Sequence, residues 1–410
     1  MRTRRNVTAL VAIFIGLVAM PASAAPGDVD TSFGAEGLAS DGYGCGGSCT
    51  QPNDVVTLED GRLVAVGAVS HESLPYFGVH AYTTVFGARG AVLEPGFGAA
   101  RGDLNALRAI AATADGGAYT AGWGRRCLDP LPLEECTLSR SFFMVAKHTS
   151  AGDADLAFDD DGVVLTPMGA GDAVATGIAP TAGGGVVAAG TATDAQGRPV
   201  MAIARYLAAG RLDPSFGNRG RVLVRGVNGA DVAVTATGKV VALGDAGGEL
   251  VVLRFLASGT PDPGFGTNGR VDVVVADRPV TAADVTLSGA KVVAGGSAQT
   301  VGGTTGFGVA RLTASGVPDT RFSGDGVVVT SFAEGSAGLD GLAIGAGAAV
   351  IAAGGNGVVR YTPRGARDRT FGGDGRAWIP WAARGLALDG NGGAILAVFA
   401  DGLALTRVEA

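Results

Sequence analysis

The chain has 410 residues, of which 70 are glycine; 47% are hydrophobic, 17% are charged and the formal net charge is −7. A mildly acidic chain argues against nucleic acid or an anionic lipid surface as the main partner. Glycine and alanine alternate with valine, and no stretch sustains a long amphipathic helical period. This pattern predicts many short strands joined by tight turns.

The first 24 residues resemble an export signal. Arg2, Arg4 and Arg5 precede an apolar stretch over residues 8–20, and the small residues "ASA" stand at 22–24. This stretch is shorter than the roughly 20 residues that span a bilayer. We therefore predict a cleaved signal peptide over residues 1–24 and a single soluble domain over residues 25–410, secreted or periplasmic, with no membrane span.

Four cysteines interrupt this domain in two loops, one reading "CGGSC" and the other "CLDPLPLEEC". An even number of cysteines in an exported chain predicts disulfides, and pairing within each loop is the simplest connectivity. A site with four thiolate ligands is the alternative. The predicted disulfide residues are Cys45 with Cys49 and Cys127 with Cys136.

An eleven-residue phrase recurs along the whole chain, as in "GRLDPSFGNRG" (210–220) and "GTPDPGFGTNG" (259–269). The spacing is about 50–60 residues, a period typical of propellers, solenoids and other repeat folds. Its phenylalanine stands at Phe33, Phe97, Phe158, Phe216, Phe265, Phe322 and Phe371, and its aspartate at Asp213, Asp262, Asp319 and Asp368, among other copies.

Each interval between phrases carries two further signatures. One is a turn followed by a strand, such as "DGRLVAVG" (60–67) or "TGKVVALG" (237–244), and the other is a strand such as "AIARYLAAG" (202–210). A Gly-containing pair between apolar runs favours a hairpin. Four antiparallel strands per repeat predict an all-β, seven-bladed β-propeller of four-stranded repeats, with an open solenoid as the alternative. We favour the closed ring because its two ends can meet.

These motifs resemble the delta-60 repeat, a bacterial β-propeller repeat of unknown function. The resemblance covers essentially the whole domain and implies an exported propeller, without any catalytic residue to carry over. It is weakest in the first two repeats, where the phrase departs most from the pattern.

The phrase has a mechanical interpretation. Its aspartate can accept hydrogen bonds from nearby backbone N–H groups, its phenylalanine can fill the seam between blades, and its last two residues would turn the chain into the inner strand of the next blade. Arg205 and Arg254 each precede the phrase aspartate by eight residues, as do three other cations. We expect structural ion pairs there rather than a ring of ligand-binding arginines.

Catalytic and metal-binding patterns are weak. His80 and His148 fall in what we expect to be outermost strands, while His71 lies in a loop beside Ser70 and Glu72, where neighbours in sequence rarely form a triad. The acidic run over residues 153–162 could bind calcium, but its spacing departs from the EF-hand pattern and fits a turn better. We expect no metal, no cofactor and no catalytic residue, and place no paired carboxylates at the channel.

Departures from the repeat mark where specificity would lie. They are residues 40–54, 70–77, 123–140 and 377–385, which we expect on one face, in loops that join first to second or third to fourth strands. The leading hypothesis is a non-enzymatic, monomeric scaffold that binds a protein or glycan through this face. A propeller lyase or glycan hydrolase and a structural module of the cell envelope are the alternatives. The predicted binding residues are Tyr76, Trp123, Arg125, Arg126, Trp378 and Trp381.

Overall fold

The computed structural model describes residues 24–42, 48–71, 78–94, 105–127, 139–275, 278–400 and 402–409. These residues form strands and turns, with one short 3-10 helix, η2 (Ala346–Ala348). Among them, no helix has the length and apolar character needed to cross a bilayer. Residues 1–23 of the predicted signal peptide lie outside the described residues, as do Tyr76, Phe97, Cys45 and Cys136.

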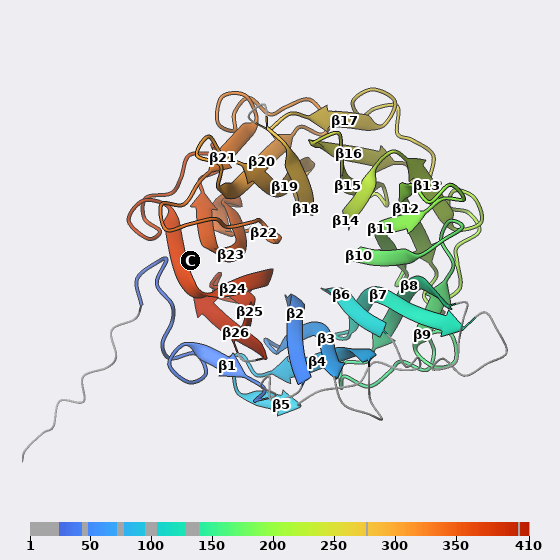
Figure 1. Cartoon of the computed structure of the whole chain (residues 1–410), viewed down its shortest axis with the longest axis horizontal. Coiled ribbons are helices and arrows are strands. Elements are labelled where there is room, and N and C mark those ends of the chain that lie inside the picture. The colour runs from blue at the N-terminus through green and yellow to red at the C-terminus, as the bar shows by residue number, and fades with distance from the viewer. Residues whose placement is uncertain are drawn as a thin grey trace, which may run out of the picture.

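Six antiparallel sheets, which we call blades, surround a central axis in the described part of the chain (Figure 1). Blades one to five have four strands each, in chain order from the axis outward. Blade one consists of β2 (Ser48–Thr57), β3 (Leu63–His71), β4 (Gly78–Phe86) and β5 (Val92–Glu94), and blade two of β6 (Asn105–Ala112), β7 (Ala118–Cys127), β8 (Ser139–His148) and β9 (Val163–Thr166). Blade three consists of β10 (Ala173–Pro180), β11 (Val186–Thr193), β12 (Pro199–Tyr206) and β13 (Arg221–Arg225), and blade four of β14 (Asn228–Val234), β15 (Val240–Ala246), β16 (Glu249–Phe255) and β17 (Arg270–Val273). Blade five consists of β18 (Val280–Ser288), β19 (Lys291–Gln299), β20 (Thr305–Leu312) and β21 (Val327–Thr330).

The sixth blade departs from this plan and corrects the predicted count. It has six strands, ordered β1-β26-β25-β24-β23-β22. The prediction of seven four-stranded blades is therefore wrong. The reason is strand continuity, because β24 pairs with both β23 and β25, so the last two sequence repeats share one sheet. The strands are β1 (Leu38–Ser40), β22 (Gly341–Ile344), β23 (Val350–Tyr361), β24 (Arg376–Leu388), β25 (Ala394–Phe399) and β26 (Leu403–Val408).

The ring is closed by the N-terminal part of the described chain. Strand β1 pairs with β26, with Leu38 opposite Thr406, so the first strand completes the last sheet (Figure 1). The Gly27 N–H also donates to the Glu409 carbonyl at 2.7 Å. The closed β-propeller is therefore confirmed and the open solenoid is wrong. A closed ring also leaves only short strand edges for aggregation.

The phrase joins the third and fourth strands of one blade, which corrects the predicted strand order. In "GRLDPSFGNRG" the Asp213 N–H donates to the Arg205 carbonyl at 2.8 Å, and the chain then enters β13, which pairs with β12 of the same blade. The next strand, β14, is the inner strand of the following blade. His80 and His148 consequently lie on third strands, β4 and β8, and the prediction that they are outermost is wrong.

The phrase side chains hold neighbouring blades together. Phe216 is fully buried in a cluster with Met201 of blade three and Val240 of blade four. The Arg205 guanidinium lies 4.8 Å from the Phe216 ring centroid, binds Asp213 at 2.6 Å and donates to the Ala257 carbonyl of the next repeat. The same burial, at 0% exposure, is found for Phe33, Phe158, Phe216, Phe265, Phe322 and Phe371. A guanidinium that stacks on a buried aromatic ring and pairs with a carboxylate is a structural joint.

Candidate functional site

The central channel is walled by the innermost strands, and backbone bulges determine which side chains enter it. Strands β2, β6, β10, β14, β18, β22 and β24 lie nearest the axis (Figure 1). All but β22 skip one residue in their ladder with the next strand of the chain. A bulge leaves its extra residue unpaired and re-aims its side chain. The skipped residues are Asn53, Arg108, Thr176, Ala230, Ala283 and Arg384.

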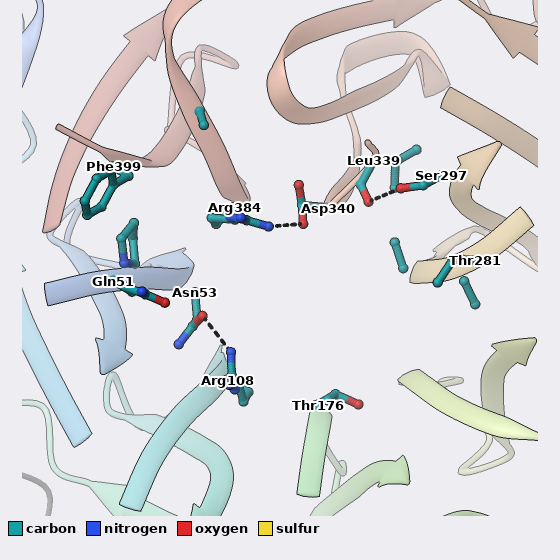
Figure 2. Close-up of a pocket in the computed structure, with 14 residues that line it drawn as sticks. Gln51, Asn53, Arg108, Thr176, Thr281, Ser297, Leu339, Asp340, Arg384 and Phe399 are labelled. Carbon is teal, nitrogen blue, oxygen red and sulfur yellow. Dashed lines mark hydrogen bonds and ion pairs between the residues drawn. The ribbon is translucent and has the colours of Figure 1, made fainter. Parts of the chain in front are cut away.

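Two chambers lie along this channel. The first has a volume of about 580 Å³ and the second about 440 Å³. We call the set of residues that lines both chambers the waist, and it consists of Asn53, Arg108, Thr176, Ala283, Asp340 and Arg384. The first chamber is further lined by Gln51, Thr281, Ser297 and Phe399 (Figure 2).

The first chamber opens at the face where the inner strands begin. Gln51 and Thr281 stand near the start of β2 and β18, and Phe399 is the last residue of β25. Second strands end at this face, so the connections after β3 and β7 leave from it as well. The irregular segments 70–77 and 123–140 thus connect second strands to third strands. The prediction that they connect first to second or third to fourth strands is wrong.

The structure places the predicted tryptophans near this face but not in the chambers. Trp123 lies near the end of β7 and is half-buried. Trp378 packs on Phe332 with ring centroids 5.6 Å apart, and Trp381 packs against the core of the sixth blade. In the described part of the chain neither chamber is lined by tryptophan. Arg125 is exposed on β7. The structure does not describe the side chains of Arg126, Cys49 and Cys127.

Three aspartates that follow bulges link the inner strands of successive blades. Asp54 Oδ2 accepts a hydrogen bond from the Ile110 N–H at 2.9 Å. Likewise, Asp231 Oδ2 accepts from Val285 at 3.0 Å and Asp284 Oδ2 accepts from Leu342 at 2.5 Å. Each contact crosses from one blade to the next, so these carboxyl groups are part of the ring's framework as well as of the second chamber.

Burial changes the ionisation of these groups. It raises the pKa of Asp54 to about 7 and that of Asp340 to about 6. Asp231 and Asp284 are hydrogen bonded to each other; burial raises the pKa of both, and the charge of Asp284 raises the pKa of Asp231 further. Two carboxyl groups in such contact share a proton because both cannot ionise cheaply. The channel therefore carries less negative charge near neutral pH than its aspartates suggest.

Two arginines enter the waist from either side of β2. Arg108 is on β6 and donates from Nη1 to Asn53 Oδ1 at 3.2 Å (Figure 2). Arg384 is on β24, and its Nη1 lies 3.7 Å from Asp340 Oδ1. Burial lowers the pKa of Arg108, and the positive charge of Arg384 lowers it further. The waist thus holds two cations that repel each other beside one carboxylate.

The sequence-based expectation that no paired carboxylates lie at the channel is wrong. Asp231 and Asp284 form such a pair on neighbouring inner strands. A signal was available, since "NDVVT" (53–57), "ADVAV" (230–234) and "ADVTL" (283–287) share an aspartate at the same place before the hairpin turn.

The other predicted chemical features lie away from the channel. His148 Nε2 is 3.2 Å from Thr120 Oγ1, and burial lowers its pKa. Within the described ranges, no cluster of three or more His, Cys, Asp or Glu side chains could hold a metal ion, and the acidic run over residues 153–162 forms turns. The side chains of Ser70 and His71 are not described, and Glu72 lies outside the described residues.

Comparison with protein families identifies a repeat of unknown function. Residues 184–216, 235–265 and 291–322 match the model of a family described as a domain of unknown function (DUF5122) β-propeller. The matched segments lie in blades three, four and five, and each ends at the phrase phenylalanine. This supports the resemblance to a β-propeller repeat family of unknown function. No curated protein matches the chain.

Solved structures share the fold at low sequence identity. A catalytically inactive virginiamycin B lyase from Staphylococcus aureus, with quinupristin, is 11% identical over 88% of this chain and 97% of that chain, with a TM-score of 0.50. The RRP9 WD40 repeats are 8% identical over 89% of this chain and 98% of that chain, with a TM-score of 0.51. These likenesses show the propeller fold alone.

Proposed function

We propose that the protein is an exported, non-catalytic propeller that binds a glycan in the first chamber of its channel. The observation that carries this proposal is the chemistry of the chamber wall. The first chamber has a volume of about 580 Å³, within the range of roughly 300–1,000 Å³ that is typical of ligand pockets. The wall presents amides from Gln51 and Asn53 and hydroxyls from Thr281 and Ser297.

Such a wall suits a sugar better than an apolar ligand. Amide and hydroxyl groups both donate and accept hydrogen bonds, as sugar hydroxyls do. Phe399, which is 42% exposed, adds an apolar face at the chamber against which a sugar ring can stack. The irregular segments around this face would then contact the parts of the ligand that extend beyond the chamber.

Binding is tested with a glycan array followed by calorimetric titration of the best oligosaccharide. Phe399→Ala should weaken binding by about fivefold to tenfold, because it removes the stacking surface. Leu207→Ala is the matched control, since Leu207 is also an exposed apolar side chain, at 45%, on a turn outside the chamber. No glycan bound by the wild type, or equal affinities for both variants, would refute the proposal.

A glycan lyase or hydrolase is the second candidate, favoured by one observation. The pKa values of Asp54 and Asp340, about 7 and about 6, suit general acids near neutral pH. Against it, both oxygens of Asp54 accept backbone hydrogen bonds, from Val55 at 2.8 Å and Ile110 at 2.9 Å. Incubating the bound oligosaccharide with the protein and following its products by mass spectrometry decides between the candidates, because a binding protein returns the oligosaccharide intact.

Export is proposed from residues 1–24 and the cysteine loops. The mature protein should begin at Ala25, as N-terminal sequencing of the exported fraction would reveal. Peptide mapping without reduction should yield the pairs Cys45–Cys49 and Cys127–Cys136. A protein that retains its first 24 residues and four free thiols would contradict this part of the proposal.

A further inference from the structure

We infer that the waist is a subsite for an oxyanion group of the ligand, a carboxylate or a sulfate ester, so that the preferred glycan is acidic. This inference rests on the proposed function, because the anionic group would reach the waist from a sugar held in the first chamber. Arg108 and Arg384 are the residues that would bind it, with Asn53 between them (Figure 2).

Arg384 and Arg108 differ from the arginines of the repeat in how they are neutralised. The phrase arginines Arg205, Arg254 and Arg311 lie 2.6, 2.7 and 2.9 Å from a carboxylate oxygen. In contrast, Arg384 is 3.7 Å from Asp340, and Arg108 has no carboxylate within ion-pair distance in the described ranges. The chain therefore neutralises its arginines closely at the joints and leaves these two under-neutralised at the waist.

The remaining carboxyl groups of the channel do not supply the missing charge. Asp54, Asp231 and Asp284 each accept a backbone hydrogen bond from the next inner strand, which holds their side chains against the wall. Burial raises the pKa of both Asp231 and Asp284, which lowers the negative charge that this pair contributes. The waist consequently keeps positive charge in a protein whose formal net charge is −7.

The local geometry holds the two guanidinium groups in place for a ligand. Both arginines occupy bulge positions, where the strand turns one extra side chain out of the ladder. Asn53 positions Arg108, because its Oδ1 accepts from Arg108 at 3.2 Å while its Nδ2 donates to the Leu107 carbonyl at 2.6 Å. The two guanidinium charges repel each other, and an oxyanion between them would relieve the repulsion. Guanidinium groups suit this role because they bind carboxylate and sulfate-like oxygens in a fork.

The inference is tested with three oligosaccharides of equal length, one neutral, one carrying a uronic acid and one carrying a sulfate ester. Calorimetry would measure each against the wild type and against Arg108→Gln, Arg384→Gln and Arg198→Gln. Arg198 is the matched control, since its side chain is 61% exposed, as against 60% for Arg384, and it lies on a surface turn paired with Asp194. Urea unfolding of each variant establishes that it is folded.

One acidic oligosaccharide should bind the wild type about tenfold or more tightly than the neutral one, since a charged hydrogen bond is stronger than a neutral one. Arg384→Gln and Arg108→Gln should abolish that preference, while Arg198→Gln should retain it. The acidic oligosaccharide that gains affinity identifies the oxyanion.

The failures of the two proposals are distinguishable. If neutral and acidic oligosaccharides bind equally and Arg384→Gln changes neither affinity, the anion subsite is refuted and the glycan-binding function stands. If no oligosaccharide binds, the glycan-binding function is refuted. In that case, free glucuronate and inorganic sulfate test the anion subsite alone. Binding that is lost in Arg384→Gln would support the subsite, and no binding of either anion would refute it.

Discussion

Replacing Phe216 by alanine tests whether the repeated phrase is a joint between blades. Phe216 is fully buried between blades three and four, and the Arg205 guanidinium stacks on its ring at 4.8 Å. Truncating a buried phenylalanine costs about 3–5 kcal/mol, since apolar contacts are lost and a cavity remains. The lost stacking adds about 0.5–1 kcal/mol. We therefore expect Phe216→Ala to lower the free energy of unfolding by about 3.5–6 kcal/mol.

The assay is equilibrium unfolding in urea, followed by intrinsic fluorescence and far-UV circular dichroism on the same samples. Coincident transitions and an unchanged slope would justify reading the shift in midpoint as a change in stability. Phe216→Leu keeps most of the volume and should cost about 1–1.5 kcal/mol. Leu207→Ala, at a residue that is 45% exposed, should change stability by less than about 0.5 kcal/mol. A loss below about 1 kcal/mol for Phe216→Ala would show that the ring does not hold the seam.

Three further predictions concern charge and backbone at the same framework. A hydrogen bond from Lys239 lowers the pKa of Asp262 to about 2, so the stability that this carboxylate contributes is present above pH 3.8 and lost as the pH falls through 2. In urea unfolding at pH 7, Asp262→Asn should therefore lower the free energy of unfolding by about 3 kcal/mol. An equal loss at pH 2 would contradict the reasoning. Burial raises the pKa of Asp231, so the folded protein holds a proton that the unfolded chain releases, and stability falls as the pH rises. Asp231→Asn keeps a hydrogen-bond donor toward Asp284, so it should match the stability of the wild type at pH 5 and exceed it at pH 9. The same stability difference between variant and wild type at both pH values would count against this prediction. A Cβ at Gly177 would lie 2.2 Å from Asp231 Oδ1, so Gly177→Ala should lower stability by about 1–3 kcal/mol. The control Gly183→Ala places a Cβ with no atom within 4 Å and should cost less than about 0.5 kcal/mol. Equal unfolding midpoints for the two variants would show that the Cβ at Gly177 is not crowded by Asp231.

Local features of the fold could be predicted because they depend on short stretches of chain. The phrase forms its own turn, in which the Phe216 N–H donates to the Asp213 carbonyl at 3.1 Å. The eight-residue spacing from Arg205 to Asp213 likewise produces an ion pair, because both residues belong to one strand-to-turn corner. Repetition of such corners predicted an all-β propeller, since a four-stranded sheet with apolar faces must pack against its neighbours.

Strand assignment and the number of blades depended on pairing that no local pattern specifies. The strand after the phrase could pair with the blade before it or the blade after it, and only the assembled sheets show that β13 joins β12. The unbroken course of β24 through residues 376–388 joins the last two repeats in one sheet. Neither outcome follows from propensity, because β pairing is a choice between distant partners.

Residues far apart in the chain meet at the waist only because the ring closes. In the printed sequence Arg108, Asp340 and Arg384 stand in unrelated contexts, and nothing in their local motifs distinguishes them from surface residues. Closure through β1 and β26 brings their strands around one axis, and the bulges turn their side chains toward it. Repeated hydrogen bonds and buried rings are encoded within each repeat, whereas a cluster of charges on the axis exists only once all the sheets share that axis.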